Sequence, residues 1–276
     1  MQRILDQKKI GFIGAGNMTQ TVVGALIEAK KVKPSQIWVT NRTERKLQKM
    51  KSDYGVHILK NNEELIDTCD IVFIAVKPQE IYACLEPIAS SFEPHHIVVS
   101  FAAGVTLSAL QKLIPQTHQL VRVIPNTPAS LQQAVVGYAV TKGNESLGDL
   151  IEELFEAMGV VVKIEEGEAL EALTVACSSG VGFIFELMMY WQEWLEEHGF
   201  SPEKAKELTI QTFLGASLLA QKSTLPTLTD LQNKVVSSKG VTAAGLASMR
   251  ELEIERLLRY SFEKAALRDK ELGAEA

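Results

Sequence analysis

The pattern of apolar and polar positions changes near residue 165 of this 276-residue chain. Before that point, short runs rich in β-branched residues alternate with helical stretches, which is typical of βαβ units. The run Ile71-Val72-Phe73-Ile74-Ala75-Val76 is apolar throughout, which indicates a strand covered on both faces. The pattern therefore predicts a doubly wound, mostly parallel α/β sheet. Its strands are expected at residues 9–14, 36–40, 56–59, 71–76, 97–100, 120–124, 136–140 and 160–164.

After residue 165 the apolar residues recur at helical spacing. Helices are predicted at 168–198, 202–221, 229–235 and 242–272, and Ser178-Ser179-Gly180 is the expected break in the first. The polar stretch Glu165-Glu166-Gly167 marks the boundary. We therefore expect one domain at 1–165 and an all-α domain at 166–276. Because these helices are more apolar than one subunit can cover, we also expect a homodimer with intertwined helices.

Composition narrows the classes of partner. The chain is 46% hydrophobic and 22% charged, with a formal net charge of -6 and no basic run, which argues against binding to nucleic acid. Residues 1–9 lack the apolar core of a signal peptide, and no apolar run is read as long enough to span a membrane. The cysteines and histidines show no metal-ligand spacing. A cytoplasmic protein without metal, membrane or nucleic-acid partner is expected.

A glycine-rich segment, Gly14-Ala15-Gly16-Asn17-Met18, joins the first predicted strand to a helix. Gly14 permits a tight turn, Gly16 lets a pyrophosphate approach the backbone, and the helix N-terminus offers free N–H groups to it. Thr19 stands where this fingerprint usually has Gly or Ala. Glycines also mark ordinary turns, but the position between strand and helix favours a dinucleotide site in a Rossmann domain.

The end of the second strand bears on which nicotinamide dinucleotide is bound. It reads Thr40-Asn41-Arg42-Thr43, with no acidic residue to bond the ribose hydroxyl. Arg42, with the side chains of Asn41 and Thr43, forms a predicted phosphate pocket. Thr43 also stands where it could cap the following helix. We expect NADP(H), with NAD(H) also accepted.

Further motifs stand at the carboxyl ends of later strands, where ligands bind in such sheets. They are Ala75-Val76-Lys77-Pro78, Phe101-Ala102-Ala103-Gly104 and the segment from Arg122 to Pro128. Together with the glycine turn and with Gln211–Ala216 and Gly240–Leu246, they resemble the pyrroline-5-carboxylate reductase family over nearly the whole chain. Their order and spacing are more specific than any one of them.

The resemblance implies a reductase that passes a hydride from NAD(P)H to the imine carbon of 1-pyrroline-5-carboxylate, giving L-proline. It also implies a dimer built from the helical domain, often assembled further into a decamer. The cofactor positions that it implies are Ile13, Gly14, Ala15, Gly16, Asn17, Met18, Asn41, Asn62, Ala75, Val76, Lys77, Pro78, Phe101, Ala102 and Ala103. The substrate positions that it implies are Val241 and Thr242, and Asn126 in the loop at the same sheet edge is added to them.

An iminium carbon is already electrophilic, so hydride transfer needs mainly positioning and a clamp for the carboxylate. We expect Thr242 to be the catalytic residue, with its hydroxyl hydrogen-bonded to the ring nitrogen. Backbone N–H groups of Gly240 to Thr242, at a helix start, would hold the carboxylate. The simpler alternative is that Thr242 is only the N-cap of the last helix.

Two departures from the family pattern keep other functions open. Cys177 to Phe183 replaces a Ser-Gly-Ser-Gly-Pro-Ala-Tyr type segment, and Ser237 to Thr242 replaces Ser-Pro-Gly-Gly-Thr-Thr. Lys239 adds a cation close to where a carboxylate must bind. A divergent, non-catalytic NADPH-binding accessory protein is therefore one alternative. A β-hydroxyacid dehydrogenase is another, but it needs a lysine on the first interdomain helix, and residues 168–193 contain none.

Overall fold

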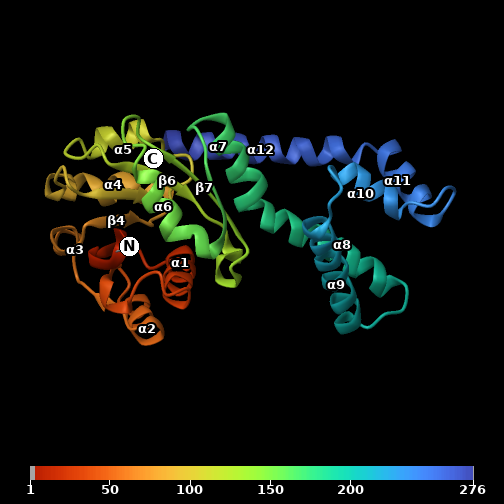
Figure 1. Ribbon diagram of the computed structural model, residues 1–276, viewed down its shortest axis with the longest axis horizontal. Coiled ribbons are helices and arrows are strands. Elements are labelled where there is room, and N and C mark those ends of the chain that lie inside the picture. Colours follow the sequence, from red (N-terminus) through yellow and green to blue (C-terminus); the bar gives the residue numbers. More distant parts are fainter. Residues whose placement is uncertain (1–3, 276) are drawn as a thin grey trace. The chain divides into compact units, whose positions relative to one another are not determined.

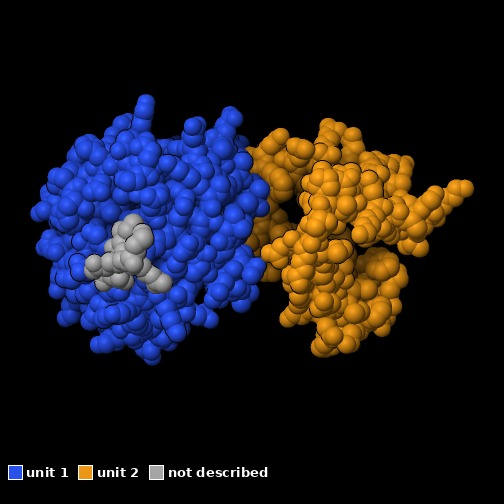
Figure 2. Space-filling view, viewed as in Figure 1, with its two compact units in different colours: residues 1–179, 265–276 blue, residues 180–264 orange. Residues whose placement is uncertain are grey.

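The computed structural model describes residues 4–275, which pack as two units. Unit 1 is Met1–Ser179 with Ala265–Ala276, and unit 2 is Gly180–Lys264 (Figure 2). By contacts, then, residues 166–179 and the end of the chain belong with the sheet. The expected boundary at residue 165 follows the change of sequence pattern instead.

Unit 1 is built around an eight-stranded sheet within the described residues, in the order β3-β2-β1-β4-β5-β6-β7-β8 (Figure 1). Neighbouring strands are parallel, except that β7 runs antiparallel to β6. The predicted strands and fold class are confirmed, with strand ends that differ by at most two residues. The strands are β1 Ile10–Ile13, β2 Ile37–Thr40, β3 His57–Ile58, β4 Ile71–Ile74, β5 Ile97–Ser100, β6 Leu120–Ile124, β7 Ala134–Val140 and β8 Gly159–Lys163.

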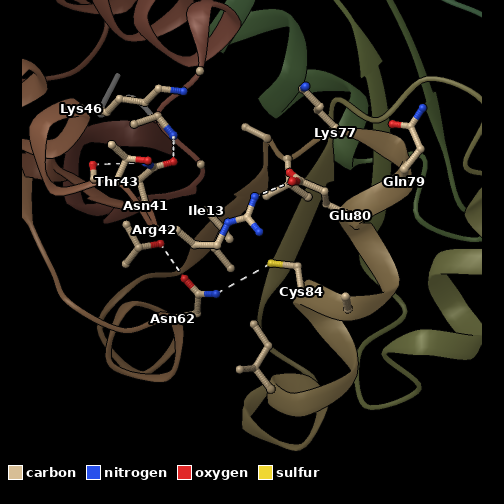
Figure 3. Close-up of a pocket in the computed structure, with 18 of the residues that line it drawn as sticks. Ile13, Asn41, Arg42, Thr43, Lys46, Asn62, Lys77, Gln79, Glu80 and Cys84 are labelled. Carbon is tan, nitrogen blue, oxygen red and sulfur yellow. Dashed lines mark hydrogen bonds and ion pairs between the residues drawn. The ribbon is translucent and has the colours of Figure 1, made fainter.

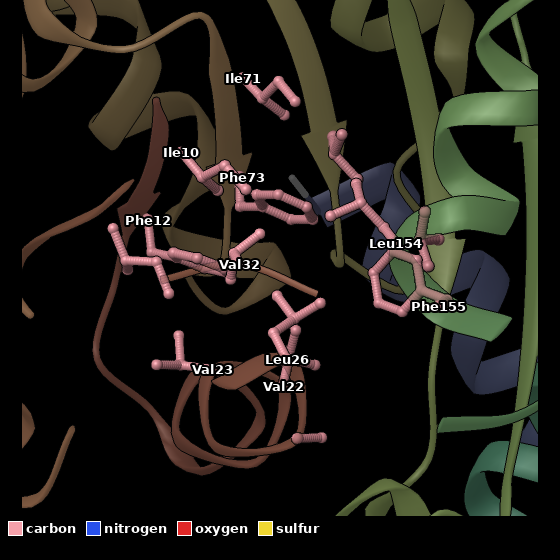
Figure 4. Packing of buried hydrophobic residues seen from close by; sticks show 14 of the residues in the cluster. Ile10, Phe12, Val22, Val23, Leu26, Val32, Ile71, Phe73, Leu154 and Phe155 are labelled. Carbon is pink, nitrogen blue, oxygen red and sulfur yellow. The ribbon is translucent and has the colours of Figure 1, made fainter. Parts of the chain in front are cut away.

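Each face of the sheet buries its own hydrophobic cluster. On one face Phe12 and Phe73 stack with ring centroids 4.6 Å apart, against Leu26 (Figure 4). The other face holds Ile13 and Ile74. Alternate residues of one strand thus enter different cores, which explains the unbroken apolar runs. The helices of unit 1 are α1 Asn17–Glu28, α2 Glu44–Tyr54, α3 Asn62–Thr68, α4 Ile81–Leu85, α5 Leu107–Leu113, α6 Leu147–Phe155 and α7 Glu168–Leu173.

Unit 2 is helical, as expected. It contains α8 Gly180–Glu197, α9 Pro202–Lys222, α10 Leu228–Val235 and α11 Val241–Glu251, and α12 Ile254–Glu275 continues into unit 1. The expected break of the helix at Ser178–Gly180 was wrong. Thr174–Ser179 forms a π-helical turn instead, and the chain stays helical through it. The last predicted helix is broken, at Glu253, whose φ is 51°.

The helix over Glu168–Glu197 is long and apolar enough to cross a membrane by length and composition alone, with a mean hydropathy of 1.6 over its most apolar window. The expectation that no stretch reaches that length was therefore wrong. Small residues at 178–182 interrupt the large apolar side chains but leave the mean hydropathy high. Only 22% of that window is buried, so much of its apolar surface needs a covering.

The end of α12 packs closely against the loop after β5, within unit 1. Gly104 has a φ of +74°, and a Cβ atom there would overlap the carbonyl oxygen of Asp269. A Cβ atom on Gly273 would in turn overlap the carbonyl oxygen of Gly104. Two glycines therefore let the two backbones meet without side chains between them.

Beside this contact lies a buried charged cluster. Arg122 of β6 donates from Nη1 to Oε1 of Glu166 at 2.8 Å, and the same oxygen accepts the N–H of Leu107 at 2.8 Å. Asp269 is also buried, and burial raises the pKa of its carboxyl, while the charge of Arg122 acts in the opposite direction. The cluster joins the sheet, the start of α7 and the end of α12.

Candidate active site

The glycine turn after β1 has the geometry of a pyrophosphate cradle. Gly14 has a φ of +114°, and a Cβ atom there would lie 2.5 Å from the carbonyl oxygen of Ala75. Gly16 is the N-cap of α1, and no atom lies within 4 Å of where its Cβ would be. The first position thus needs glycine for backbone conformation, and the second leaves space in front of the helix N-terminus.

The structure shows why Thr19 can stand where this fingerprint usually has Gly or Ala. Its side chain is buried, and Oγ1 donates to the carbonyl oxygen of Gly14 at 2.8 Å. A threonine at this position therefore fastens the turn to the helix that follows it, and the turn keeps its shape without a third small residue.

A pocket of about 580 Å³ opens at the carboxyl ends of β1, β2 and β4 (Figure 3). Its lining includes most of the residues predicted to bind the cofactor: Ile13, Gly14, Ala15, Gly16, Asn41, Arg42, Thr43, Asn62, Ala75, Val76 and Lys77. Because parallel strands end at the same sheet edge, motifs separated by sixty residues come together there.

Two asparagines shape this pocket. Asn41 accepts the N–H of Ala15 on Oδ1 at 3.2 Å, which ties the end of β2 to the glycine turn. Asn62 accepts from Oγ1 of Thr40 at 2.7 Å and donates to Sγ of Cys84 at 3.7 Å. Burial raises the pKa of the Cys84 thiol, so it is neutral in the pocket.

Arg42 and Glu80 face each other across the pocket and form an ion pair between Nη2 and Oε1 (Figure 3). Arg42 follows β2, whereas Glu80 lies in the 3-10 turn Pro78–Glu80 that follows β4. Lys46, in the first turn of α2, also lines the pocket. Thr43 occupies the N-cap position of α2, as the capping alternative expects, but its side chain makes no capping hydrogen bond.

A smaller cavity of about 160 Å³ adjoins the first, since Ala75 and Val76 line both. Three further predicted residues line it, Met18, Phe101 and Ala103. The other predicted cofactor residues line neither cavity. Asn17 is exposed at the start of α1, Pro78 begins the 3-10 turn, and Ala102 is buried.

Asn126 is buried and engaged within the fold. Its Nδ2 donates to the carbonyl oxygen of Cys177 at 3.1 Å, and its Oδ1 accepts the N–H of Val135 at 3.0 Å. Its neighbour Pro125 lines the smaller cavity and accepts from Oγ of Ser178 at 3.1 Å. These bonds hold the loop after β6 against the π-helical turn.

The predicted substrate residues other than Asn126 lie together at the start of α11, in unit 2. Lys239 has a φ of 58°, Gly240 is the N-cap, and Val241 and Thr242 form the first turn. The proposed N-cap role of Thr242 was therefore wrong, because Gly240 occupies that position. Val241 is 93% exposed and Thr242 is also exposed, so one chain presents this loop to solvent.

Several residues of the two cavities were missed by sequence reasoning. Lys46 could have been found from its position in the first turn of the helix that follows the predicted phosphate pocket. Glu80 follows a predicted motif directly, but its pairing with Arg42 spans 38 positions and leaves no local pattern. The others are Thr40, Gln79, Ala83, Cys84, Pro87 and Ile88 in the larger cavity, and Ile124, Pro125, Thr174 and Ser178 in the smaller.

The described residues contain no cluster of three or more His, Cys, Asp or Glu side chains that could hold a metal ion.

The sheet, the glycine turn and the long pocket define a Rossmann-type, NAD(P)-dependent oxidoreductase. Residues 9–104 match a family described as NADP oxidoreductase, coenzyme F420-dependent, and residues 167–272 match pyrroline-5-carboxylate reductase dimerisation.

Comparison with known proteins identifies the family. The pyrroline-5-carboxylate reductase of Pseudomonas aeruginosa is 31% identical over 98% of each chain. A solved pyrroline-5-carboxylate reductase from Coxiella burnetii is 31% identical, with a TM-score of 0.85 over 97% of this chain and 99% of that one. That of Plasmodium falciparum, solved with NADP bound, has a TM-score of 0.86 at 23% identity over 98% and 99% of the two chains. The chain belongs to the pyrroline-5-carboxylate reductase family.

Proposed function

We propose that this chain reduces 1-pyrroline-5-carboxylate to L-proline in proline biosynthesis, with NADPH as the hydride donor and NADH as a second donor. The observation that carries the proposal is the identity of 31% with a pyrroline-5-carboxylate reductase over 98% of both chains. Such a match includes both the sheet and the helices, whereas the glycine turn alone occurs in many Rossmann enzymes. The cavities at the sheet edge support the same reaction.

The residues of unit 1 bind and orient the cofactor in this proposal. The dinucleotide, when bound, supplies the hydride. Gly14 and Gly16 give a pyrophosphate access to the N-terminus of α1, and Arg42 with Asn41 and Thr43 forms the end of the pocket that receives a 2′-phosphate. The smaller cavity, with Phe101 and Ala103, receives the nicotinamide half. Asn17, Pro78 and Ala102 support these segments from outside the two cavities.

The substrate is held by the start of α11. The N–H groups of Gly240 to Thr242 point out of a helix N-terminus and suit a carboxylate. Lys239 adds a positive charge to this carboxylate site, and the Thr242 hydroxyl bonds the ring nitrogen as hydride arrives at the neighbouring carbon. Asn126 acts from the loop after β6 and, because its amide is already bonded, contributes by holding that loop in place.

The chain forms oligomers through its helical part, which matches a dimerisation family. We propose that residues 1–165 bind the cofactor, that 166–276 form the homodimer and the substrate loop, and that dimers assemble further into a decamer. The apolar face of α8 is then covered by another copy and not by lipid. With 34 acidic against 28 basic residues, the net charge of the chain is negative and does not favour binding to nucleic acid. The reaction takes place in the cytoplasm in this proposal.

One observation favours a second function. Lys239 adopts a left-handed backbone conformation at a position where the family usually has glycine, and such a conformation is unfavourable for a residue with a side chain. A substrate loop altered in this way suits a divergent accessory protein that binds NADPH without turnover.

A turnover assay separates these functions. The purified chain is given NADPH and 1-pyrroline-5-carboxylate, and both NADPH consumption and L-proline formation are measured. We expect equal amounts of the two. Gly16→Asp is the control, because its side chain enters open space but places a negative charge where the pyrophosphate binds. NADPH binding without proline formation would establish the accessory function. In a separate assay with NADP⁺ and a β-hydroxyacid, formation of NADPH would establish the dehydrogenase.

A further inference from the structure

Glu80 is the acidic side chain of the pocket that faces Arg42 directly. It lies at the far side of the pocket from α2, and its carboxylate pairs with the guanidinium that the proposed function assigns to the 2′-phosphate of NADPH (Figure 3). We propose that Glu80 is a cofactor-selectivity residue, which competes with the 2′-phosphate for Arg42 and thereby lowers the preference of the chain for NADPH over NADH. This inference rests on the proposed function.

The competition follows from charge. A phosphate monoester carries about -1.5 to -2 charges at pH 7, so it gains from Arg42 and Lys46 and is repelled by a carboxylate beside them. The 2′-phosphate of NADPH must therefore displace the Glu80 carboxylate from Arg42. It then lies close to that carboxylate and is repelled by it. NADH carries no such phosphate, so the ion pair persists when it binds.

The positions of the side chains set the size of the effect. The Arg42 side chain is 84% exposed and that of Glu80 is 39% exposed, so solvent screens the pair and either partner can rotate away. Glu80 is thus a weak competitor: it lowers the preference for NADPH without abolishing it. A fully buried acid would exclude the phosphate.

Nearby groups allow the exchange. Lys46 lies in the first turn of α2 and lines the same pocket as Arg42, so a phosphate that displaces Glu80 meets two cations. Lys77 also lines the pocket, on the same side as Glu80, and adds a third cation to its lining. The thiol of Cys84 stays neutral there because burial raises its pKa, so it adds no second negative charge.

The inference is tested by binding, with no turnover needed. Dissociation constants for NADP⁺ and NAD⁺ are measured by calorimetry at low ionic strength for the wild type and for Glu80→Gln, which keeps the shape and removes the charge. NADP⁺ should bind about 3- to 10-fold more tightly to Glu80→Gln, and NAD⁺ should bind equally well to both proteins. Adenosine 2′,5′-bisphosphate and adenosine 5′-monophosphate, which lack the nicotinamide half, should repeat this difference.

Two controls give the result its meaning. Glu86→Gln makes the same change of net charge in a neighbouring segment but outside the pocket lining, and it should alter neither constant. In an Arg42→Ala background, NADP⁺ binding is weaker by about tenfold or more, and Glu80→Gln should restore less than it gains in the wild type.

Other outcomes would overturn the inference. Weaker binding of NAD⁺ to Glu80→Gln means that Glu80 bonds the ribose hydroxyls. Weaker binding of NADP⁺ to Glu80→Gln, and weaker still to Glu80→Ala, means that Glu80 orients Arg42 for the phosphate. If the wild type binds neither dinucleotide, the proposed function fails and the inference fails with it, whereas normal binding without an effect of Glu80→Gln removes the inference alone.

Discussion

The two units of this chain differ in how far they bury their large apolar side chains. In unit 1, helices cover both faces of the sheet, and the strands β1 and β4 are buried throughout. In unit 2, large apolar side chains of α8 stay exposed, among them Phe185 and Trp194. The proposed cofactor pocket lies within unit 1, whereas the proposed substrate loop begins α11 and is exposed in one chain. One chain is thus enough to build the dinucleotide pocket, but the helical half needs further copies to cover its surface.

The strongest test of this difference between the units is to place a charge on the exposed apolar face of α8. Phe185 is 59% exposed in one chain, so Phe185→Glu should leave the fold intact but bury an unpaired carboxylate in the dimer. We expect dimerisation to weaken by about 2 kcal/mol or more, roughly 30-fold in the dissociation constant. Sedimentation across a dilution series measures it, with circular dichroism to check helicity.

Val160→Glu is the matched control for that experiment. Val160 lies on the edge strand β8 of unit 1 and is 66% exposed, so the same substitution is made at an equally apolar and exposed position of the other unit. This variant should sediment like the wild type. An effect of equal size at both positions would contradict the assignment of dimerisation to the helical half.

Thr242 tests whether the exposed loop handles the substrate. Thr242→Val keeps the shape and removes the hydroxyl, and a bond that strengthens in the transition state should affect kcat more than KM. The expected loss of turnover is about tenfold to a few hundredfold, or roughly 1.4 to 3 kcal/mol. Steady-state kinetics and thermal melting are measured on the same preparation.

Thr227→Val is the matched control, which should lower stability without changing turnover. Thr227 caps α10 by accepting the N–H of Asp230 on Oγ1 at 3.1 Å, so its loss should lower stability by about 1 kcal/mol and leave the kinetics of the folded enzyme unchanged. Unchanged turnover in Thr242→Val would remove Thr242 from the catalytic residues.

Asp269 gives the smallest expected effect and probes how the end of α12 is held in unit 1. Burial raises the pKa of its carboxyl above the ordinary 3.8, so the folded chain binds this proton more tightly than the unfolded chain does. The stability that the proton contributes is present below the ordinary pKa and is lost as the pH rises through the folded value. Arg122 and Glu171 are the charged groups that act on this carboxyl.

Asp269→Asn removes this pH dependence, because an amide resembles the protonated acid in shape and carries no charge. The free energy of unfolding, measured with denaturant from pH 3 to 7, should therefore fall less with rising pH in the variant than in the wild type. Parallel curves for the two proteins would show that Asp269 is equally solvated in the folded and unfolded chains.

The strands could be predicted because burial on both faces leaves an unbroken apolar run, a signal local to each strand. The glycine turn and Arg42 could be predicted for the same reason, since each stands next to a strand end. The π-helical turn could not, because α- and π-helical turns differ in hydrogen-bond partner and not in composition. Glu80 shows a further limit: its role depends on an ion pair with Arg42 across the pocket, which only the folded chain brings together.

The contact between Gly104 and Gly273 also bears on the order of events during synthesis. Gly104 follows Ala103 of the smaller cavity in the loop after β5, but the residue that packs on it, Gly273, lies near the end of α12. A nascent chain that has folded its sheet still lacks this contact until α12 has been synthesised, even though domains generally begin to fold from the N-terminal side. Unit 1 thus acquires its full packing only once α12 has been synthesised, so a product that stops before α12 exposes the loop after β5 to proteases and chaperones.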